Sequence, residues 1–169
     1  MIRQNHALEH AVMSILTSSG ETGQVMARSD WSGFFVYGPV STEAVRRAAH
    51  EGLARLKAGD MALALHPRCG TNLAVNVLLS GTAAYAVAAR KSDSRLARLQ
   101  RMLLAVMGAM LIARPLGAWV QRHVTTTPDL SDVLAIGEIR REERGGVVSH
   151  HVAIVRERDA LPVALRRPS

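Results

Sequence analysis

The stretch LAVNVLLSGTAAYAVAA, residues 73–89, decides how this chain is organised, because its seventeen residues carry no charged side chain. At about 1.5 Å per residue such a helix covers roughly 25 Å, which is short for a hydrocarbon core of about 30 Å but within the range of spanning helices. A second apolar run, residues 99–120, is interrupted by Arg101 and Arg114. The two runs predict an apolar helical hairpin over residues 71–122.

The hairpin has two interpretations. Apolar runs of about 10–14 residues are often core helices of soluble proteins, so the hairpin could be buried in a larger fold. The chain has only 169 residues, and the remainder is too short to surround two such helices on all sides. We therefore expect a membrane hairpin.

The charge balance agrees with a membrane partner. The net charge is +7, which suits nucleic acid or an anionic membrane surface. Nucleic-acid binding favours aromatic side chains among clustered basic ones, whereas only 4% of residues are aromatic and they lie away from the basic runs. We expect contact with anionic lipid head groups and no nucleic-acid partner.

The membrane orientation stays open. Basic residues in and beside the hairpin loop would place that loop in the cytoplasm by the positive-inside tendency; they are Arg90, Lys91, Arg95, Arg98 and Arg101. The N-terminus lacks the apolar region of a signal peptide that could export the rest. Alternatively, the hairpin dips into one leaflet with its arginines on lipid head groups. A bacterial-type inner membrane is expected, with the side of the soluble part and the oligomeric state open.

The flanking segments predict a small α+β domain. Apolar residues recur at helical spacing over 5–18 and from Ser41, a good N-cap, to about Ala58. Runs 24–27 and 34–37 read as a β-hairpin, 61–65 as a short buried strand, and 133–140 and 147–156 as two further strands. The predicted organisation is 1–70 as an α/β part, 71–122 as the hairpin, 123–156 as a completing β-hairpin and 157–169 as a basic tail.

The run His6-Ala7-Leu8-Glu9-His10 carries the clearest chemistry. Residues four apart share one face of a helix, so His6 and His10 can bind one metal ion. Glu9 lies close enough to reach a bound water, which is the arrangement that metal-assisted hydrolysis requires. The spacing predicts a divalent-metal site, with Zn²⁺ as the cofactor and Glu9 as the catalytic base.

This run resembles the H-x-x-E-H motif of the inverted zincins, the pitrilysin/insulysin-type metallopeptidases. The resemblance implies that both histidines bind zinc and that Glu9 is the general base, acting on a peptide or protein substrate. It covers about five residues, and the downstream glutamate ligand of those enzymes has no counterpart here. The chain also resembles small uncharacterised bacterial membrane proteins with NHALEH and HPxCGTN motifs, matched here by residues 5–10 and 66–72.

A zinc site needs at least a third ligand, and His66 and Cys69 are the best candidates. Their spacing, in a loop between the predicted strand 61–65 and the first apolar helix, suits joint coordination. His50 and Glu51 are weaker candidates. Cys69 is the only cysteine, so it forms no internal disulfide; it could instead be a buried small residue or a nucleophile with His66 as base.

Two pairs of polar residues outside these motifs are further candidates for structural or substrate-binding roles. His150 and His151 on a strand point to opposite faces, so both are expected to be structural. Arg114, a charge inside an apolar helix, either reaches the membrane edge or binds substrate, and Asn72 is a second candidate substrate contact.

The sequence therefore favours a membrane-associated zinc-dependent hydrolase, most simply a metallopeptidase. One alternative is a non-catalytic metal-binding membrane protein in which Cys69 closes a four-ligand site. A second is a membrane-tethered interaction module whose histidines are incidental.

Overall fold

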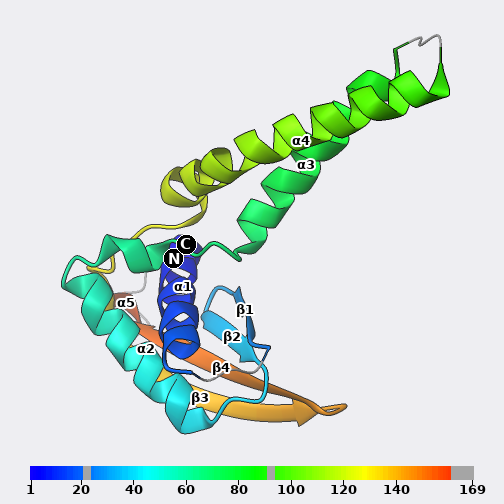
Figure 1. Ribbon diagram of the computed structural model, residues 1–169. Coiled ribbons are helices and arrows are strands. Elements are labelled where there is room, and N and C mark those ends of the chain that lie inside the picture. Colours follow the sequence, from blue (N-terminus) through cyan, green and yellow to red (C-terminus); the bar gives the residue numbers. More distant parts are fainter. Residues whose placement is uncertain (21–23, 91–93, 161–169) are drawn as a thin grey trace. The chain divides into compact units, whose positions relative to one another are not determined.

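The computed structural model describes residues 1–20, 24–90 and 94–160, which divide into two compact units (Figure 1). Met1–His66 and Thr126–Ser169 form the first unit, and Pro67–Thr125 form the second. The fold is α+β, as predicted, with an apolar helical hairpin inserted into the chain of the mixed unit.

The first unit is built on a four-stranded antiparallel sheet with the order β1-β2-β4-β3. Its strands are Met26–Ser29, Gly33–Tyr37, Val133–Arg144 and Val147–Arg156, numbered β1 to β4. The central pair joins segments more than a hundred residues apart, with Phe34 opposite Val152. Glycine is required at position 33, because a Cβ there would lie 1.9 Å from the Val152 carbonyl oxygen.

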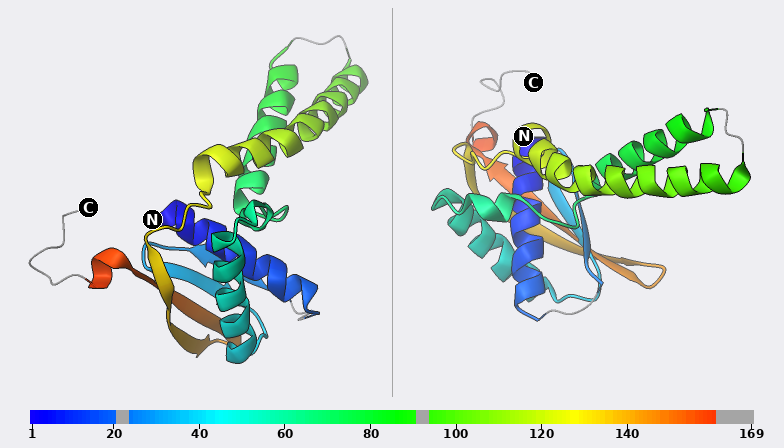
Figure 2. Two further views of the ribbon diagram at one scale, coloured as in Figure 1. Left: turned by 90° about the vertical axis from the view of Figure 1, so that its left-hand side faces the viewer. Right: turned by 45° about the horizontal axis from the view of Figure 1, so that its top comes forward.

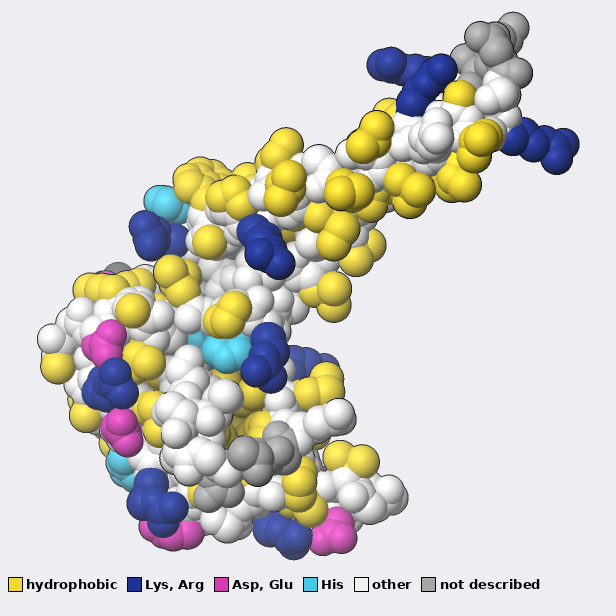
Figure 3. Space-filling view, in the orientation of Figure 1, with side chains coloured by type: hydrophobic (Ala, Val, Ile, Leu, Met, Phe, Trp, Pro, Cys, Tyr) yellow, Lys and Arg dark blue, Asp and Glu magenta, His cyan; other side chains and the backbone are white. Residues whose placement is uncertain are grey.

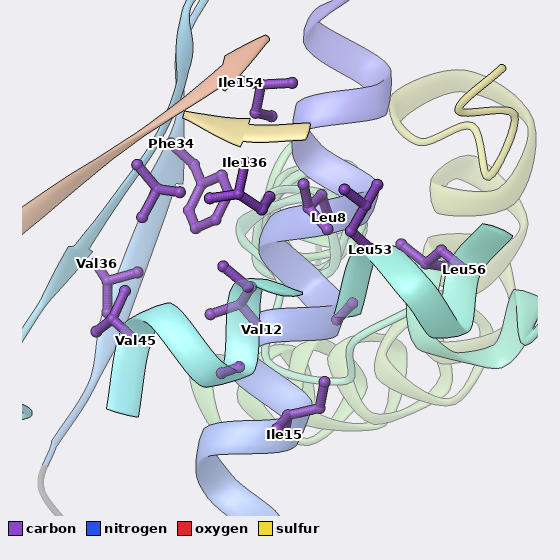
Figure 4. Close-up of a cluster of buried hydrophobic side chains, with 14 of the residues drawn as sticks. Leu8, Val12, Ile15, Phe34, Val36, Val45, Leu53, Leu56, Ile136 and Ile154 are labelled. Carbon is purple, nitrogen blue, oxygen red and sulfur yellow. The ribbon is translucent and has the colours of Figure 1, made fainter. Parts of the chain in front are cut away.

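Helices α1 (Ile2–Ser18) and α2 (Thr42–Lys57) cover one face of this sheet (Figure 1). Figure 4 shows the core between them, where Leu8 and Val12 of α1 meet Leu53 of α2 and Phe34 of β2. Fully burying such a side chain contributes roughly 1.5–3 kcal/mol, so this interface holds α1 in place.

Helix α2 begins as the sequence predicted. The Ser41 hydroxyl accepts a hydrogen bond from the Ala44 amide at 3.1 Å, which satisfies one of the unpaired amides at the helix start. Gly52 on the same helix lets α1 approach closely, since a Cβ there would lie 3.1 Å from the Ala11 Cβ.

Two predictions about the first unit were wrong in part. Residues Met61–Ala64 form a 3₁₀ turn, η1, and not a strand. A short apolar run does not distinguish the two, and this one has no strand beside it to pair with. Residues Glu157–Ala160 form a short helix, α5, where a tail was predicted; residues 161–169 lie outside the described part.

The second unit is an antiparallel pair of helices, α3 (Gly70–Ala88) and α4 (Arg95–Val120), followed by the π-helical turn η2 (Gln121–Thr125) (Figure 2). Hydrophobic side chains cover the visible outside of the hairpin, with arginine side chains toward its tip (Figure 3). Leu78, Tyr85 and Leu111 each expose 71–75% of their surface. Both helices are long and apolar enough to cross a membrane.

Candidate metal centre

The centre of the site is His10, which lies on the buried side of α1 and exposes only 2% of its surface. Its Nδ1 donates a hydrogen bond to the Ala64 carbonyl at 2.7 Å, which leaves Nε2 as the nitrogen with a lone pair. Among the described residues, Nε2 has no hydrogen-bond partner. A buried ring nitrogen without a partner is costly, and in the neutral imidazole this is the nitrogen that can bind a metal.

Two further imidazoles lie beside His10. The ring centroids of His6 and His10 are 4.3 Å apart, as expected for residues four apart on one helix, and a ring nitrogen of each lies within 4.8 Å of the other. The ring of His66 is 6.0 Å from that of His10. Nitrogens that share a tetrahedral zinc are about 3.3 Å apart, so the separation of His6 and His10 is close to that of two ligands of one ion, and His66 is the next nearest imidazole.

The turn η1 explains why His66 belongs to this cluster. Ala64, its last residue, is buried and offers the carbonyl that orients His10, and His66 follows two residues later. The turn η1, predicted as a strand, therefore positions two residues of the site: its Ala64 carbonyl orients the His10 ring, and the chain that leaves it carries His66. Only the part played by His66 could be predicted from the sequence.

Glu9 is also buried, with 8% of its surface exposed, and its Oε2 accepts a hydrogen bond from the Ser29 hydroxyl of β1. Adjacent helical residues point about 100° apart, so Glu9 turns toward the sheet edge while His10 turns toward η1. The sequence identified Glu9 but not Ser29, because nothing in the pattern links residues twenty apart on a helix and a strand.

The start of α1 is anchored by a buried polar network. Asn5 is fully buried; its Nδ2 donates to the Asp30 carbonyl at 2.7 Å, and its Oδ1 accepts from the guanidinium of Arg156. Arg156 is 1% exposed and lies 3.4 Å from Asp132. Burial lowers the pKa of Arg156, although Asp132 opposes the shift. This network fixes the first turn of α1, directly before His6.

The remaining predicted site residues belong to the second unit. Cys69, a buried cysteine, caps α3: its Sγ accepts a hydrogen bond from the Thr71 amide at 3.4 Å. Asn72 donates to the Pro67 carbonyl at 3.0 Å, and it lines a groove together with Arg114. Only Pro67 and Arg68 separate Cys69 from His66 along the chain.

His150 and His151 point to opposite faces of β4, as predicted. His150 is fully buried beside the Thr42 hydroxyl at 3.1 Å, and burial, together with the charge of Arg141, lowers its pKa. The weaker candidates His50 and Glu51 are exposed on α2. None of these residues is part of the histidine cluster.

Ser32, His151 and Asp30 form a second polar group that has the composition of a catalytic triad but not its geometry. The serine hydroxyl and an Asp30 carboxylate oxygen both lie 3.2 Å from the same ring nitrogen, Nε2 of His151. A triad needs the carboxylate on the other nitrogen. Burial raises the pKa of Asp30, but hydrogen bonds from Ser32 and Gly33 outweigh it, so that pKa is lowered. The group stabilises a turn.

Comparison with known proteins identifies the family but not an activity. The family model described as "Domain of unknown function (DUF6391)" matches residues 1–139, which include the histidine cluster and the hairpin. An uncharacterized protein of Picosynechococcus sp. (strain ATCC 27264 / PCC 7002 / PR-6) is 36% identical over 163 residues, 90% of this chain and 78% of that protein. No solved structure matches significantly. The chain belongs to the DUF6391 family.

Proposed function

We propose that this protein is a membrane-associated zinc-dependent hydrolase, most simply a metallopeptidase, in which His6, His10 and His66 bind the metal and Glu9 activates water. The observation that carries the proposal is the state of His10: a buried ring whose Nδ1 is fixed on a carbonyl and whose Nε2 has no partner among the described residues. Metal-bound histidines almost always donate their other ring nitrogen in this way.

Three histidines suit a catalytic centre. A zinc ion held by three protein ligands keeps one coordination position for water and lowers the pKa of that water to about 7. Glu9 is adjacent to a ligand and is held by Ser29, so its carboxylate has a fixed orientation. With zinc bound, Glu9 would serve to accept a proton from the attacking water. The motif's resemblance to the inverted zincins favours a peptide substrate.

The membrane part of the proposal rests on the surface of the hairpin. Large apolar side chains that expose 71–75% of their area, such as Leu78, Tyr85 and Leu111, are unfavourable in water and favourable in lipid. Helix α3 has 19 residues, which corresponds to about 28 Å, close to the thickness of the hydrocarbon core.

A second candidate function is a closed, non-catalytic metal site. Cys69 follows His66 by three residues, a separation of at most about 11 Å along an extended chain, and thiolate is a preferred zinc ligand. A fourth protein ligand would leave no position for water. The third possibility, an interaction module with incidental histidines, predicts no stoichiometric metal.

Metal content tests the site itself. We expect the purified full chain to hold one zinc ion, and His10→Ala to lose most of it, because the substitution removes a ligand and opens the cluster. His123→Ala is the matched control, since His123 lies on η2 and stacks on Trp119. Equal zinc in both variants, or none in the wild type, would overturn both metal proposals.

Activity tests the role of Glu9. Glu9→Gln keeps the size and hydrogen-bonding capacity of the side chain but removes the base, so peptide hydrolysis should fall about 10²–10⁴-fold with zinc retained. Glu51→Gln, an exposed carboxylate on α2, is the control. Full activity of Glu9→Gln on a fluorogenic peptide library would exclude the catalytic proposal. Loss of zinc in Cys69→Ser would favour the closed site.

A further inference from the structure

The second unit contains a half-open groove of about 700 Å³ between α3 and α4. Its lining combines basic and amide side chains with small apolar ones; the main contributors are Arg68, Asn72, Asn76, Ala113, Arg114 and Ala118. The volume lies within the usual range of small-molecule sites. A groove with polar groups in an otherwise apolar hairpin indicates a ligand site.

Close packing of the two helices forms this groove. Gly117 of α4 faces Asn72 of α3, and a Cβ at position 117 would lie 2.3 Å from the Asn72 Oδ1. Glycine at position 117 favours this close approach, because a side chain there would displace the Asn72 amide and crowd its Cα. Asn72 and Asn76 lie in the first two turns of α3, and Arg114 lies six residues before the end of α4, so the groove is at the end of the hairpin away from the loop.

The groove offers hydrogen-bond donors and positive charge. The Oδ1 of Asn76 accepts from the Ser80 hydroxyl at 3.3 Å, which directs its amide N–H groups away from that contact. Arg114 has a guanidinium with five N–H donors. Asp93 is the single acidic residue in Pro67–Thr125, against eight Lys and Arg, so the sequence supplies almost no carboxylate to neutralise these charges. The ligand that fits is an anion.

We propose that the groove binds the phosphate of an anionic lipid head group, with Arg114 as the main charged contact and Asn76 as a hydrogen-bond donor. An arginine inside an apolar helix is costly unless it is paired, and the planar guanidinium matches phosphate oxygens. The groove is much larger than one phosphate group, which leaves room for the glycerol backbone. This proposal rests on the membrane part of the proposed function and is independent of the zinc site.

Lipid retention tests the proposal. The full chain, purified in mild detergent, is mixed with equal amounts of phosphatidylglycerol and phosphatidylcholine, and bound lipids are counted by native mass spectrometry. We expect phosphatidylglycerol to be retained preferentially. Arg114→Gln and Asn76→Leu should each reduce that retention several-fold, whereas Arg101→Gln, on the same helix outside the groove, should not. Asn76→Leu favours an apolar helix, so its effect cannot be attributed to unfolding of α3.

Several results would overturn the proposal. Equal retention of the two lipids, or equal loss in Arg114→Gln and Arg101→Gln, would mean that only general electrostatic attraction acts. Displacement of the lipid by millimolar inorganic phosphate would identify a soluble phosphate as the ligand. Failure to associate with vesicles of either lipid would refute the membrane part of the proposed function as well, while zinc content in the same samples reports on the metal site separately.

Discussion

The two units differ in where their large apolar side chains lie: in the interior of the first unit and on the outside of the hairpin. In the first unit Leu8, Val12 and Phe34 are completely buried between helices and sheet, whereas in the hairpin Leu78 and Leu111 point outward. The same residue types occupy both positions. The first unit buries its apolar side chains as a protein in water does, whereas the exposed apolar surface of the hairpin is what the proposed membrane association explains.

The polar groups follow the same division. In the first unit buried polar side chains find protein partners, such as Asn5 with Arg156 and Glu9 with Ser29. His10 Nε2 is an exception that the zinc proposal explains. In the hairpin, Arg114 and Asn76 gather in one groove, where we propose a lipid phosphate as their partner.

Matched leucine substitutions should give the largest effect. Leu8→Ala removes a fully buried side chain and should lower the free energy of unfolding of the first unit by about 2–5 kcal/mol. Leu78→Ala, on the outside of α3, should change it little. Hydrogen exchange of the β2 amides at Phe34–Val36 measures both. Equal protection of these amides in the two variants would contradict the assignment of inside and outside.

A charge on the hairpin should give the next largest effect. Met107 is 62% exposed and lies near the middle of residues 102–113, the stretch of α4 without a charged side chain. An arginine there should make the free energy of membrane insertion about 2.5–3.5 kcal/mol less favourable. Leu96→Arg, in the first turn of the same helix, is the control. Alkaline extraction of membranes should release Met107→Arg more readily. Identical extraction of the two variants would indicate that α4 is not in lipid.

The smallest expected effect is a pH dependence from the core of the first unit. Because burial lowers the pKa of His150 below its ordinary 6.5, this group contributes stability that is present above pH 6.5 and is lost as the pH falls through its lowered pKa. The urea midpoint of the wild type should therefore fall on acidification, and His150→Gln should show a shallower fall. The same slope in both proteins would rule out this contribution.

Patterns local in sequence predicted most of the fold. Helical spacing located α1 and α2, long apolar runs located both hairpin helices, and Ser41 was identified as an N-cap because capping depends on residues three apart. The run 61–65 was misassigned because a strand is defined by its neighbours, which lie elsewhere in the chain. The length of an apolar run and its pattern of alternation do not show whether another strand lies beside it to pair with.

The candidate site was predictable to the extent that it is local. His6, Glu9 and His10 were predicted from their spacing on one helix, and His66 was predicted from its place in the run 66–72. Ser29 and the Ala64 carbonyl were not predictable, because the tertiary fold brings them to α1 across 20 and 54 residues. The groove was foreseen only as two separate residues, Asn72 and Arg114, since its shape depends on the close approach at Gly117.

X-ray absorption at the zinc edge of the purified chain identifies the atoms that bind the metal. We expect a four-coordinate zinc with three imidazole nitrogens at about 2.0–2.1 Å and one oxygen, and loss of the imidazole signal in His10→Ala. A sulfur at about 2.3 Å would select the closed site with Cys69. A protein without zinc, or a spectrum unchanged in His10→Ala, would contradict the assignment of His6, His10 and His66 as a metal centre.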